Sequence, residues 1–290
     1  MKKKQALRKM EKDIHLRGLA TSTRNVYLRN TKAFLKFADT AIKKLNENKA
    51  RDFLSHLINE RKLAAKTVNT YSAAIRFFFA VTLNRPMNYL QIPLMKVPKQ
   101  LPVIATREEI AKLVDSCKNL KHKAMILLAY GSGLRISEIS RLKTSDIKTD
   151  EMRIFVCGAK GKKDRYTLLP QKTLDFLRLY WKKYRPNNSE NWVFPSKERQ
   201  THITKDGVGY GIKSAVLKSS IATYVTAHTL RHDFATHLLE DGVELIKIKE
   251  FLGHSSIRTT TLYLHLANTT KNVISPADTL ELEQTKDVII

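Results

Sequence analysis

Apolar side chains recur at three- and four-residue spacing through the first third of the chain, which is the period of an amphipathic helix. The polar run Thr21-Ser22-Thr23 precedes one such face and marks a helix start. The pattern predicts helices over about residues 21–37, 46–61 and 67–83. The side chains that it places in their shared core are Val26, Tyr27, Thr31, Phe34, Leu35, Phe37, Ala50, Phe53, Leu54, Leu57, Ile58, Tyr71, Ala74, Phe77, Phe78 and Val81. Because helical spacing continues from Ala6 to Arg85, this region is expected to be an all-helical module.

The helical pattern stops at a proline-containing stretch, residues 91–105, which is basic and shows little periodicity. Such a composition is typical of an extended linker between domains. The chain restarts with the capping sequence Thr106-Arg107-Glu108-Glu109, which is followed by apolar residues at helical spacing. We therefore expect a helical first domain over 1–94, a linker over 95–104 and a second domain over 105–290.

The second domain has a mixed pattern. Residues 152–157 alternate in the manner of a strand and residues 166–169 form a second short strand, so the lysine-rich stretch from Gly158 to Arg165 is expected to be a hairpin tip. Helices are expected elsewhere in this domain, over residues 121–130, 136–142, 171–184, 208–218, 229–239 and 243–251. The expected fold class is mainly α with a small β-sheet (α+β).

The charge balance points to a polyanionic partner. Lys and Arg outnumber Asp and Glu by 52 to 27, which gives a formal net charge of +25 on 290 residues, and such a surface attracts nucleic acid at long range. A membrane surface would also be attracted, but the sequence has no apolar run of the roughly 18 residues that a spanning helix needs. The basic run Met1 to Lys4 is not followed by the apolar segment of a secretory signal, so a cytosolic protein is expected.

The outward faces of the first predicted helices carry basic and amide side chains among threonines and tyrosines, which suit contacts with phosphate oxygens. For any one of these residues a solvated surface position is the simpler interpretation. Only the presence of many such residues together favours binding to nucleic acid. The residues expected to contact double-stranded DNA are Arg24, Arg29, Lys32, Lys66, Asn69 and Arg76.

Metal-dependent cleavage of a phosphodiester would require clustered carboxylates, histidines or thiolates. The acidic residues are scattered, and close pairs such as Glu108-Glu109 lie near predicted helix ends, where an acid complements the helix dipole. The two cysteines, Cys117 and Cys157, are too few for a disulfide framework or a zinc cluster, and both are expected to be reduced thiols in or near a core. No metal or other cofactor is therefore expected.

Arginine can take the place of a metal ion, because its guanidinium group donates two parallel hydrogen bonds to phosphate and stays charged. Arg135 follows Gly131-Ser132-Gly133 at a predicted helix start, where glycine allows the backbone to approach a ligand and the helix N-terminus favours an anion. Arg231 lies three residues after His228, so both can face one phosphate from the same helix. Taken singly, His254 and Tyr263 are more simply interpreted as structural residues.

Together these motifs resemble those of the tyrosine recombinases, the integrase family that includes the Xer recombinases. The resemblance is carried by Gly133 to Glu138, His228 to Leu238 and Leu252 to Ser255, and Tyr263 stands nine residues after His254, where this family keeps its nucleophile. The helical first domain is similar to the family's core-binding domain. About 20 residues precede the first expected core-binding helix, too few for an additional arm-binding domain, so the resemblance is to Xer-like or mobile-element-borne enzymes.

The resemblance implies that Tyr263 attacks the scissile phosphate and forms a 3′-phosphotyrosyl link, which leaves a free 5′-hydroxyl. It implies that Arg135 and Arg231 hold the phosphate and stabilise the pentacoordinate transition state. His228 and His254 are expected to add hydrogen bonds and to help manage the tyrosine proton.

The leaving oxygen needs a general acid, and the resemblance implies a lysine on the β-hairpin. Lys160 occupies the family's position before a glycine, but the hairpin is one residue longer than in typical Xer sequences, which leaves Lys162 as an alternative. Glu138 is expected either to orient a neighbouring catalytic group or to be an acid on the helix surface.

The resemblance also implies a homo-tetramer on paired DNA sites. The segment from about residue 268 is expected to be an arm that docks on a neighbouring protomer, or else a disordered terminus. Two other functions fit part of the sequence. A type IB topoisomerase would use the same phosphotransfer chemistry without site specificity, and a non-catalytic DNA-binding protein would explain the charge and the helices but not the filled catalytic positions.

Overall fold

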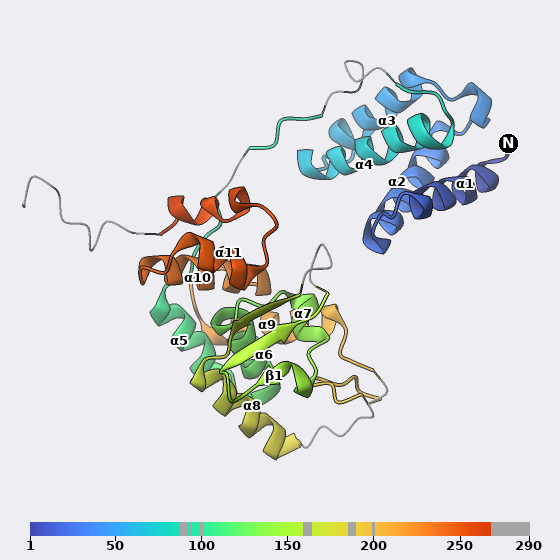
Figure 1. Cartoon of the computed structure of the whole chain (residues 1–290). Helices are drawn as coiled ribbons and strands as arrows, with labels where there is room; N and C mark the ends of the chain where they lie inside the picture. The colour runs from blue at the N-terminus through green and yellow to red at the C-terminus, as the bar shows by residue number, and fades with distance from the viewer. Residues whose placement is uncertain are drawn as a thin grey trace, which may run out of the picture. The chain divides into compact units, whose positions relative to one another are not determined.

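The computed structural model describes residues 1–87, 92, 94–98, 101–158, 164–184, 190–198 and 201–267 of the 290. The chain divides into two compact units, Met1–Gln100 and Leu101–Ile290, and Figure 1 labels their α-helices. Among the described residues, no helix combines the length and the apolar character that crossing a membrane requires.

The first unit is helical. Its elements are α1 (Lys3–Leu16), α2 (Thr21–Ala38), a 3-10 turn (Ile42–Lys44), α3 (Glu47–Asn59), α4 (Ala65–Phe77) and a π-helical turn (Phe78–Thr82). The helices predicted from apolar spacing are confirmed. The core nevertheless includes a helix before residue 21, because α1 buries Ala6, Met10 and Ile14 in the same hydrophobic cluster.

Aromatic side chains connect the helices of this unit. Phe34 of α2 is fully buried and meets the ring of Phe53 at 5.6 Å and that of Phe79 at 6.1 Å between centroids, so segments far apart in sequence share one core. Two residues predicted to be buried are instead exposed, Phe37 at 40% and Ile58 at 37%. Apolar spacing locates the centre of a helix face, but it does not define how far the contact extends to either side.

The second unit is mixed, as predicted. Its helices are α5 (Arg107–Ser116), α6 (Leu120–Gly131), α7 (Ile136–Ser140), α8 (Gln171–Tyr184), α9 (Lys205–Ser219), α10 (Ala227–Glu240) and α11 (Leu245–Leu252). Its 3-10 turns are η3 (Thr144–Asp146), η4 (Ile257–Thr259) and η5 (Thr261–His265). The strands β1 (Ile147–Lys148), β2 (Arg153–Val156) and β3 (Arg165–Leu168) form an antiparallel sheet in the order β1-β2-β3. The two predicted strands are confirmed, and β1 is additional because two residues cannot show an alternating pattern.

Helix α6 lies at the centre of the second unit. Every side chain from Ala124 to Ala129 is buried, so the helix is apolar on all sides, and α8, α9 and α10 pack around it (Figure 1). A smaller cluster, formed by Phe234, Ala235, Ile248, Leu252 and Tyr263, joins α10 and α11 to η5. This second cluster fixes the position of η5 against α10.

Both cysteines are free thiols, but only Cys117 is buried. Cys157 directly follows β2 and is exposed, so the prediction that both cysteines lie in or near a core is wrong for this one. The reason is the alternation of the strand, because Ile154 and Val156 face the core and the next residue faces the other side.

Candidate active site

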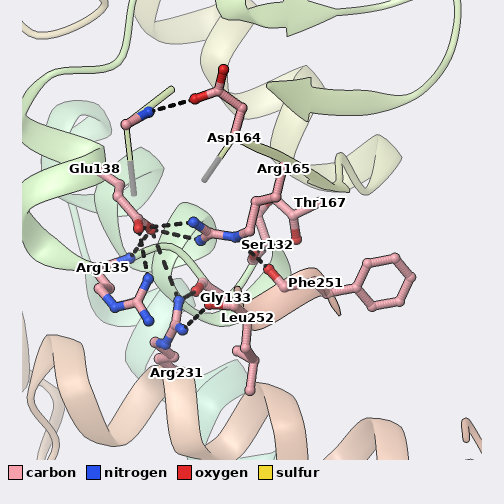
Figure 2. Close-up of polar contacts among 11 residues, drawn as sticks. Ser132, Gly133, Arg135, Glu138, Asp164, Arg165, Thr167, Arg231, Phe251 and Leu252 are labelled. Carbon is pink, nitrogen blue, oxygen red and sulfur yellow. Dashed lines mark hydrogen bonds and ion pairs between the residues drawn. The ribbon is translucent and has the colours of Figure 1, made fainter. Parts of the chain in front are cut away.

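Three arginines from separate elements converge on the carboxylate of Glu138 (Figure 2). Arg135, the residue before α7, donates from Nη1 to Glu138 Oε1 at 2.8 Å. Arg165, at the start of β3, donates from Nη1 and Nη2 to the two carboxylate oxygens at 2.9 and 2.8 Å. Arg231 of α10 brings its Nη1 to 3.9 Å from Glu138 Oε2. A loop, a strand and a helix therefore meet at one carboxylate.

Glu138 is not a surface acid, because its side chain is only 9% exposed. Its Oε2 also accepts a hydrogen bond from the backbone N–H of Arg135 at 2.8 Å. Burial by itself raises the pKa of Glu138, but the hydrogen bonds and charge of Arg165, followed by those of Arg135, outweigh burial and lower the pKa to about 2. Glu138 is therefore ionised at neutral pH and holds Arg135 in a fixed orientation.

Arg231 is buried, with 2% of its surface exposed. Its Nη1 donates to the carbonyl oxygen of Gly133 and its Nη2 donates to that of Leu252. Burial, followed by the charge of Arg135, lowers the pKa of Arg231 to about 9. The guanidinium group therefore remains protonated at neutral pH, held between the loop before α7 and the end of α11.

Gly133 is required for packing. Its φ is +61°, and a Cβ at this position would lie 2.5 Å from Cδ1 of Phe234. Gly133 therefore lets α10 pack closely, a role that the sequence does not predict. The expected effect of a helix N-terminus is small, because α7 spans only the five residues Ile136–Ser140.

Tyr263 lies in the same region. It belongs to η5, is 2% exposed and packs with Phe234 and Leu252. Its Oη is 3.1 Å from Nδ1 of His232, the residue after Arg231. Burial raises the pKa of Tyr263, whereas the positive charges of Arg231 and Arg135 act in the opposite direction. Arg135, Arg231 and Tyr263 therefore gather in one place.

His232 is not among the site residues predicted from the sequence. Burial, followed by the charges of His228 and Arg231, lowers the pKa of His232 to about 4, so the ring is neutral at pH 7. The ring meets that of His228 edge-on, with 4.5 Å between centroids. The signal that could have identified His232 is the four-residue spacing from His228, which places both histidines on one face of α10.

His228 is exposed in the first turn of α10. The hydroxyl oxygen of Thr226 caps this helix by accepting hydrogen bonds from the backbone N–H groups of His228 and Thr229. A hollow of about 440 Å³ adjoins both His228 and Arg135, and its lining also includes Ser137, Lys213 and Tyr224. Two of the predicted site residues, Arg135 and His228, therefore border one hollow.

His254 follows α11 and faces the tyrosine. Its ring is stacked on Tyr263 with 6.5 Å between centroids and an interplanar angle of 11°. Its Nδ1 lies 3.0 Å from Oγ1 of Thr260. Burial, followed by the charges of Arg231 and Arg135, lowers the pKa of His254 to about 4, so this ring is also neutral at pH 7.

Lys160 and Lys162 lie outside the described residues. The residues that flank 159–163 are joined, because Asp164 Oδ1 accepts a hydrogen bond from the Gly158 N–H at 2.7 Å (Figure 2). The next residue, Arg165, binds Glu138 and also donates from Nε to the carbonyl oxygen of Phe251 at 2.8 Å. Nothing in the sequence distinguishes Arg165 from the basic residues near it, so sequence reasoning misses its place in the cluster.

The six residues predicted to contact DNA lie on α2 and α4 of the first unit. Arg29, Lys32 and Lys66 are exposed, whereas Arg24, Asn69 and Arg76 are half-buried. Lys66 and Asn69 line a hollow between the two helices, opposite Ser22 and Thr23 of α2. Lys66 and the threonine and serine side chains therefore share one concave surface.

Arg24 and Asn69 also have partners on other segments of the first unit. Arg24 forms an ion pair with Glu11 of α1, with 3.9 Å between Nη1 and Oε1. Asn69 donates from Nδ2 to the carbonyl oxygen of Met95 at 2.9 Å, and its Oδ1 accepts from the Met95 N–H at 2.8 Å. Asn69 therefore ties the chain beyond the helices back to α4, a contact that the sequence does not predict.

Two family models match the chain. Residues 104–270 match the phage integrase family. Residues 7–89 match the N-terminal SAM-like domain of phage integrases. The first match contains the arginine cluster and Tyr263, and the second contains α2, α3 and α4.

Proteins with sequences similar to this chain are named as integrases or recombinases. The chain is 38% identical over 275 residues to the integrase/recombinase y4qK of Sinorhizobium fredii, which covers 94% of this chain and 88% of that protein. It is 32% identical over 262 residues to the tyrosine recombinase XerA of Thermococcus kodakarensis, which covers 89% and 90% of the two chains. A lambda integrase dimer bound to a COC′ core site has the same fold, with a TM-score of 0.71 and 18% identity over 95% of this chain and 98% of that one.

Proposed function

Because the chain belongs to the phage integrase family, we propose that Tyr263 is the nucleophile with which it cuts and rejoins duplex DNA. Its relatives are integrases and tyrosine recombinases, and the protein is accordingly an enzyme of site-specific DNA recombination. The observation that carries the assignment is that Tyr263 lies within the electrostatic reach of Arg231 and Arg135, whose positive charges act to lower the pKa of its hydroxyl.

Arg135 and Arg231 hold the nonbridging oxygens of the scissile phosphate. Each guanidinium group donates parallel hydrogen bonds to phosphate, and these strengthen as charge develops in the pentacoordinate transition state. Glu138 keeps Arg135 oriented before DNA arrives, so little reorganisation is needed during the reaction. His228, beside the hollow, and His254, next to Tyr263, add hydrogen bonds to the same phosphate.

Strand transfer then requires two bond changes. Tyr263 Oη forms a bond to phosphorus while the bond from phosphorus to the 5′ oxygen breaks, which leaves a 3′-phosphotyrosyl link and a 5′-hydroxyl. The departing oxygen takes a proton from a hairpin lysine, Lys160 or Lys162. Because the phosphotyrosyl link conserves the phosphate ester, the 5′-hydroxyl of a second strand can attack it and complete the exchange without a cofactor.

A nicked duplex that carries the recombination site of the protein tests the nucleophile. After cleavage beside the nick, the short 5′-hydroxyl fragment diffuses away and the covalent complex accumulates. We expect mass spectrometry of the trapped complex to find DNA on the peptide that contains Tyr263. A link to any other residue would contradict the proposal.

A plasmid relaxation assay, run beside the nicked-duplex assay, separates recombination from the activity of a type IB topoisomerase. A topoisomerase would also form a phosphotyrosyl link, but it would relax a supercoiled plasmid that has no recombination site. The integrase and recombinase relatives favour the site-specific activity. We therefore expect the covalent complex to form on DNA with the site and the plasmid without it to stay supercoiled.

We propose that the exposed basic residues of α2 and α4 bind the DNA backbone. Binding is expected to weaken steeply as salt rises, because each phosphate contact releases counterions. The double variant Arg29→Ala/Lys32→Ala should reduce the slope of log K against log salt by about 2, roughly one for each lost contact. Fluorescence anisotropy of a labelled duplex over a series of salt concentrations measures the slope.

Lys43→Ala/Lys44→Ala is the matched control for this prediction. Both lysines are exposed in the 3-10 turn of the first unit, so the variant removes the same charge from another surface. Its salt slope should equal that of the unchanged protein. Equal slopes for the two double variants would contradict a specific contact by Arg29 and Lys32.

The tetramer on paired sites is also part of the proposal, with the segment from residue 268, which lies outside the described residues, docking on a neighbouring protomer. Truncation after residue 270 should leave binding to a single site intact and abolish the complex that joins two sites. Mass photometry with one-site and two-site DNA measures both states. Unchanged pairing by the truncated protein would show that the segment has no docking role.

A further inference from the structure

We infer that His232 is the group that accepts the proton of Tyr263 during cleavage. The inference rests on the proposed role of Tyr263 as the nucleophile. His232 Nδ1 lies 3.1 Å from Tyr263 Oη, which is the distance that proton transfer to a general base requires. The oxygen in this contact is the atom that must lose its proton to bond with phosphorus.

The surroundings of Tyr263 explain why a base is needed. The side chain is 2% exposed, so bulk water has little access to the hydroxyl. Burial also raises the pKa of Tyr263, which makes an unassisted phenolate more costly than it is in water. The imidazole of His232, fixed in α10, is an acceptor already in contact with the hydroxyl.

The other charged and titratable groups around the hydroxyl are placed for different tasks. Arg231 can only donate hydrogen bonds, and two of these go to backbone carbonyls. His254 meets Tyr263 face to face and directs its Nδ1 to Thr260. His228 contacts the ring of His232 at its edge, so its charge acts on the base.

The protonation state of His232 suits this role. Burial lowers its pKa to about 4, so the ring is neutral at pH 7, and Nδ1 can accept when Nε2 carries the ring proton. A phosphodiester bound beside Arg231 brings a negative charge, which raises the pKa of an adjacent imidazole. The base therefore becomes stronger when the substrate arrives.

The two proton transfers then balance the reaction. As the bond between Tyr263 Oη and phosphorus forms, the hydroxyl proton passes to His232 Nδ1. As the bond from phosphorus to the 5′ oxygen breaks, that oxygen takes a proton from the hairpin lysine. In religation the imidazolium returns its proton to the tyrosine oxygen, which makes the tyrosine a better leaving group.

A DNA substrate in which sulfur replaces the 5′ bridging oxygen distinguishes the two proton transfers experimentally. A 5′-bridging thiolate leaves without a proton because a thiol is far more acidic than an alcohol. The sulfur substrate should therefore restore cleavage to a variant that lacks the hairpin lysine, such as the double variant Lys160→Ala/Lys162→Ala. It should not restore cleavage to a variant that cannot deprotonate Tyr263.

His232→Ala is expected to slow formation of the covalent complex by at least about 100-fold on both oxygen and sulfur substrates at pH 7, the usual contribution of a general base. Its rate should rise about tenfold per pH unit, since hydroxide must replace the lost base. The unchanged protein should instead lose rate as pH falls, because protonation blocks Nδ1. Rates come from single-turnover assays at saturating DNA, and a merely structural role would not produce this change in pH profile.

Two further variants keep the test decisive. His232→Gln fills similar space and can hydrogen-bond to Tyr263 but cannot take up a proton near pH 7, so it should show the same defect if the alanine variant fails to fold. His265→Ala removes an exposed histidine of η5 and should cleave at the normal rate. The inference is overturned if the glutamine variant cleaves normally, or if the sulfur substrate rescues it. Absence of the covalent complex with the unchanged protein would instead overturn the proposed function itself.

Discussion

Tyr263→Phe is expected to bind the recombination site with unchanged affinity and to form no covalent complex on a nicked duplex. The substitution removes only the hydroxyl oxygen, so the ring keeps its packing against Phe234 and Leu252, and the contact with His232 is lost. Without the nucleophilic oxygen no ester to the cut strand can form. A denaturing gel of end-labelled DNA detects the complex, and anisotropy measures the affinity.

Tyr130→Phe is the matched control for this result. Tyr130 Oη lies 2.9 Å from Nδ1 of His237, and burial raises the pKa of Tyr130 as it does that of Tyr263. The control therefore removes a tyrosine–histidine hydrogen bond of the same kind outside the arginine cluster. It should form the covalent complex at the normal rate. A complex formed by Tyr263→Phe would mean that another group attacks the phosphate.

Arg135→Ala and Arg231→Ala should each slow formation of the covalent complex by about 10²- to 10³-fold, which is the usual loss when one donor aimed at developing charge is removed. Affinity for DNA should change far less, because we expect the scissile phosphate to be one of many phosphates that contribute to binding. Single-turnover rates at saturating DNA separate the two effects. Arg178→Ala, on an exposed face of α8, is the control and should retain the full rate.

The two arginine variants should differ in stability. Arg231→Ala leaves the buried carbonyls of Gly133 and Leu252 without their donor, at a cost of about 1–3 kcal/mol for each unsatisfied group. Its melting temperature should therefore fall. Arg135 has a side chain that is 24% exposed, so Arg135→Ala should melt close to the unchanged protein. Normal cleavage by both variants would contradict their role at the phosphate.

Much of the fold could be predicted because its helices bury one apolar face. The bounds predicted for α8, residues 171–184, are those observed. The predicted cap at the start of α5 is also confirmed, and Thr106 forms a capping box there with Glu109. The spacing of apolar residues did not predict burial correctly at the edge of a helix face, and it did not predict an element that is very short. Phe37 lies at the edge of a helix face, and β1 has too few residues to alternate.

In the candidate site, Arg135 and Arg231 could be predicted from the motifs around them, and Tyr263 from its place nine residues after His254 in the resemblance to tyrosine recombinases. The residues that connect them could not be predicted. Arg165 reaches Glu138 across 27 positions of sequence and the backbone of Phe251 across 86, and no local pattern encodes contacts of that range. The meeting of His232 with Tyr263, 31 positions apart, likewise depends on how η5 packs on α10.

The shared carboxylate of Glu138 also sets the electrical balance of the pocket. Three guanidinium groups surround a single ionised acid, so the assembly retains a surplus of two positive charges. An intact phosphodiester carries one negative charge, whereas the five-coordinate species formed when a phenolate adds to it carries two. The two surplus positive charges therefore complement the five-coordinate dianion better than the singly charged phosphodiester of the ground state. Only such preferential stabilisation of the transition state accelerates the chemical step.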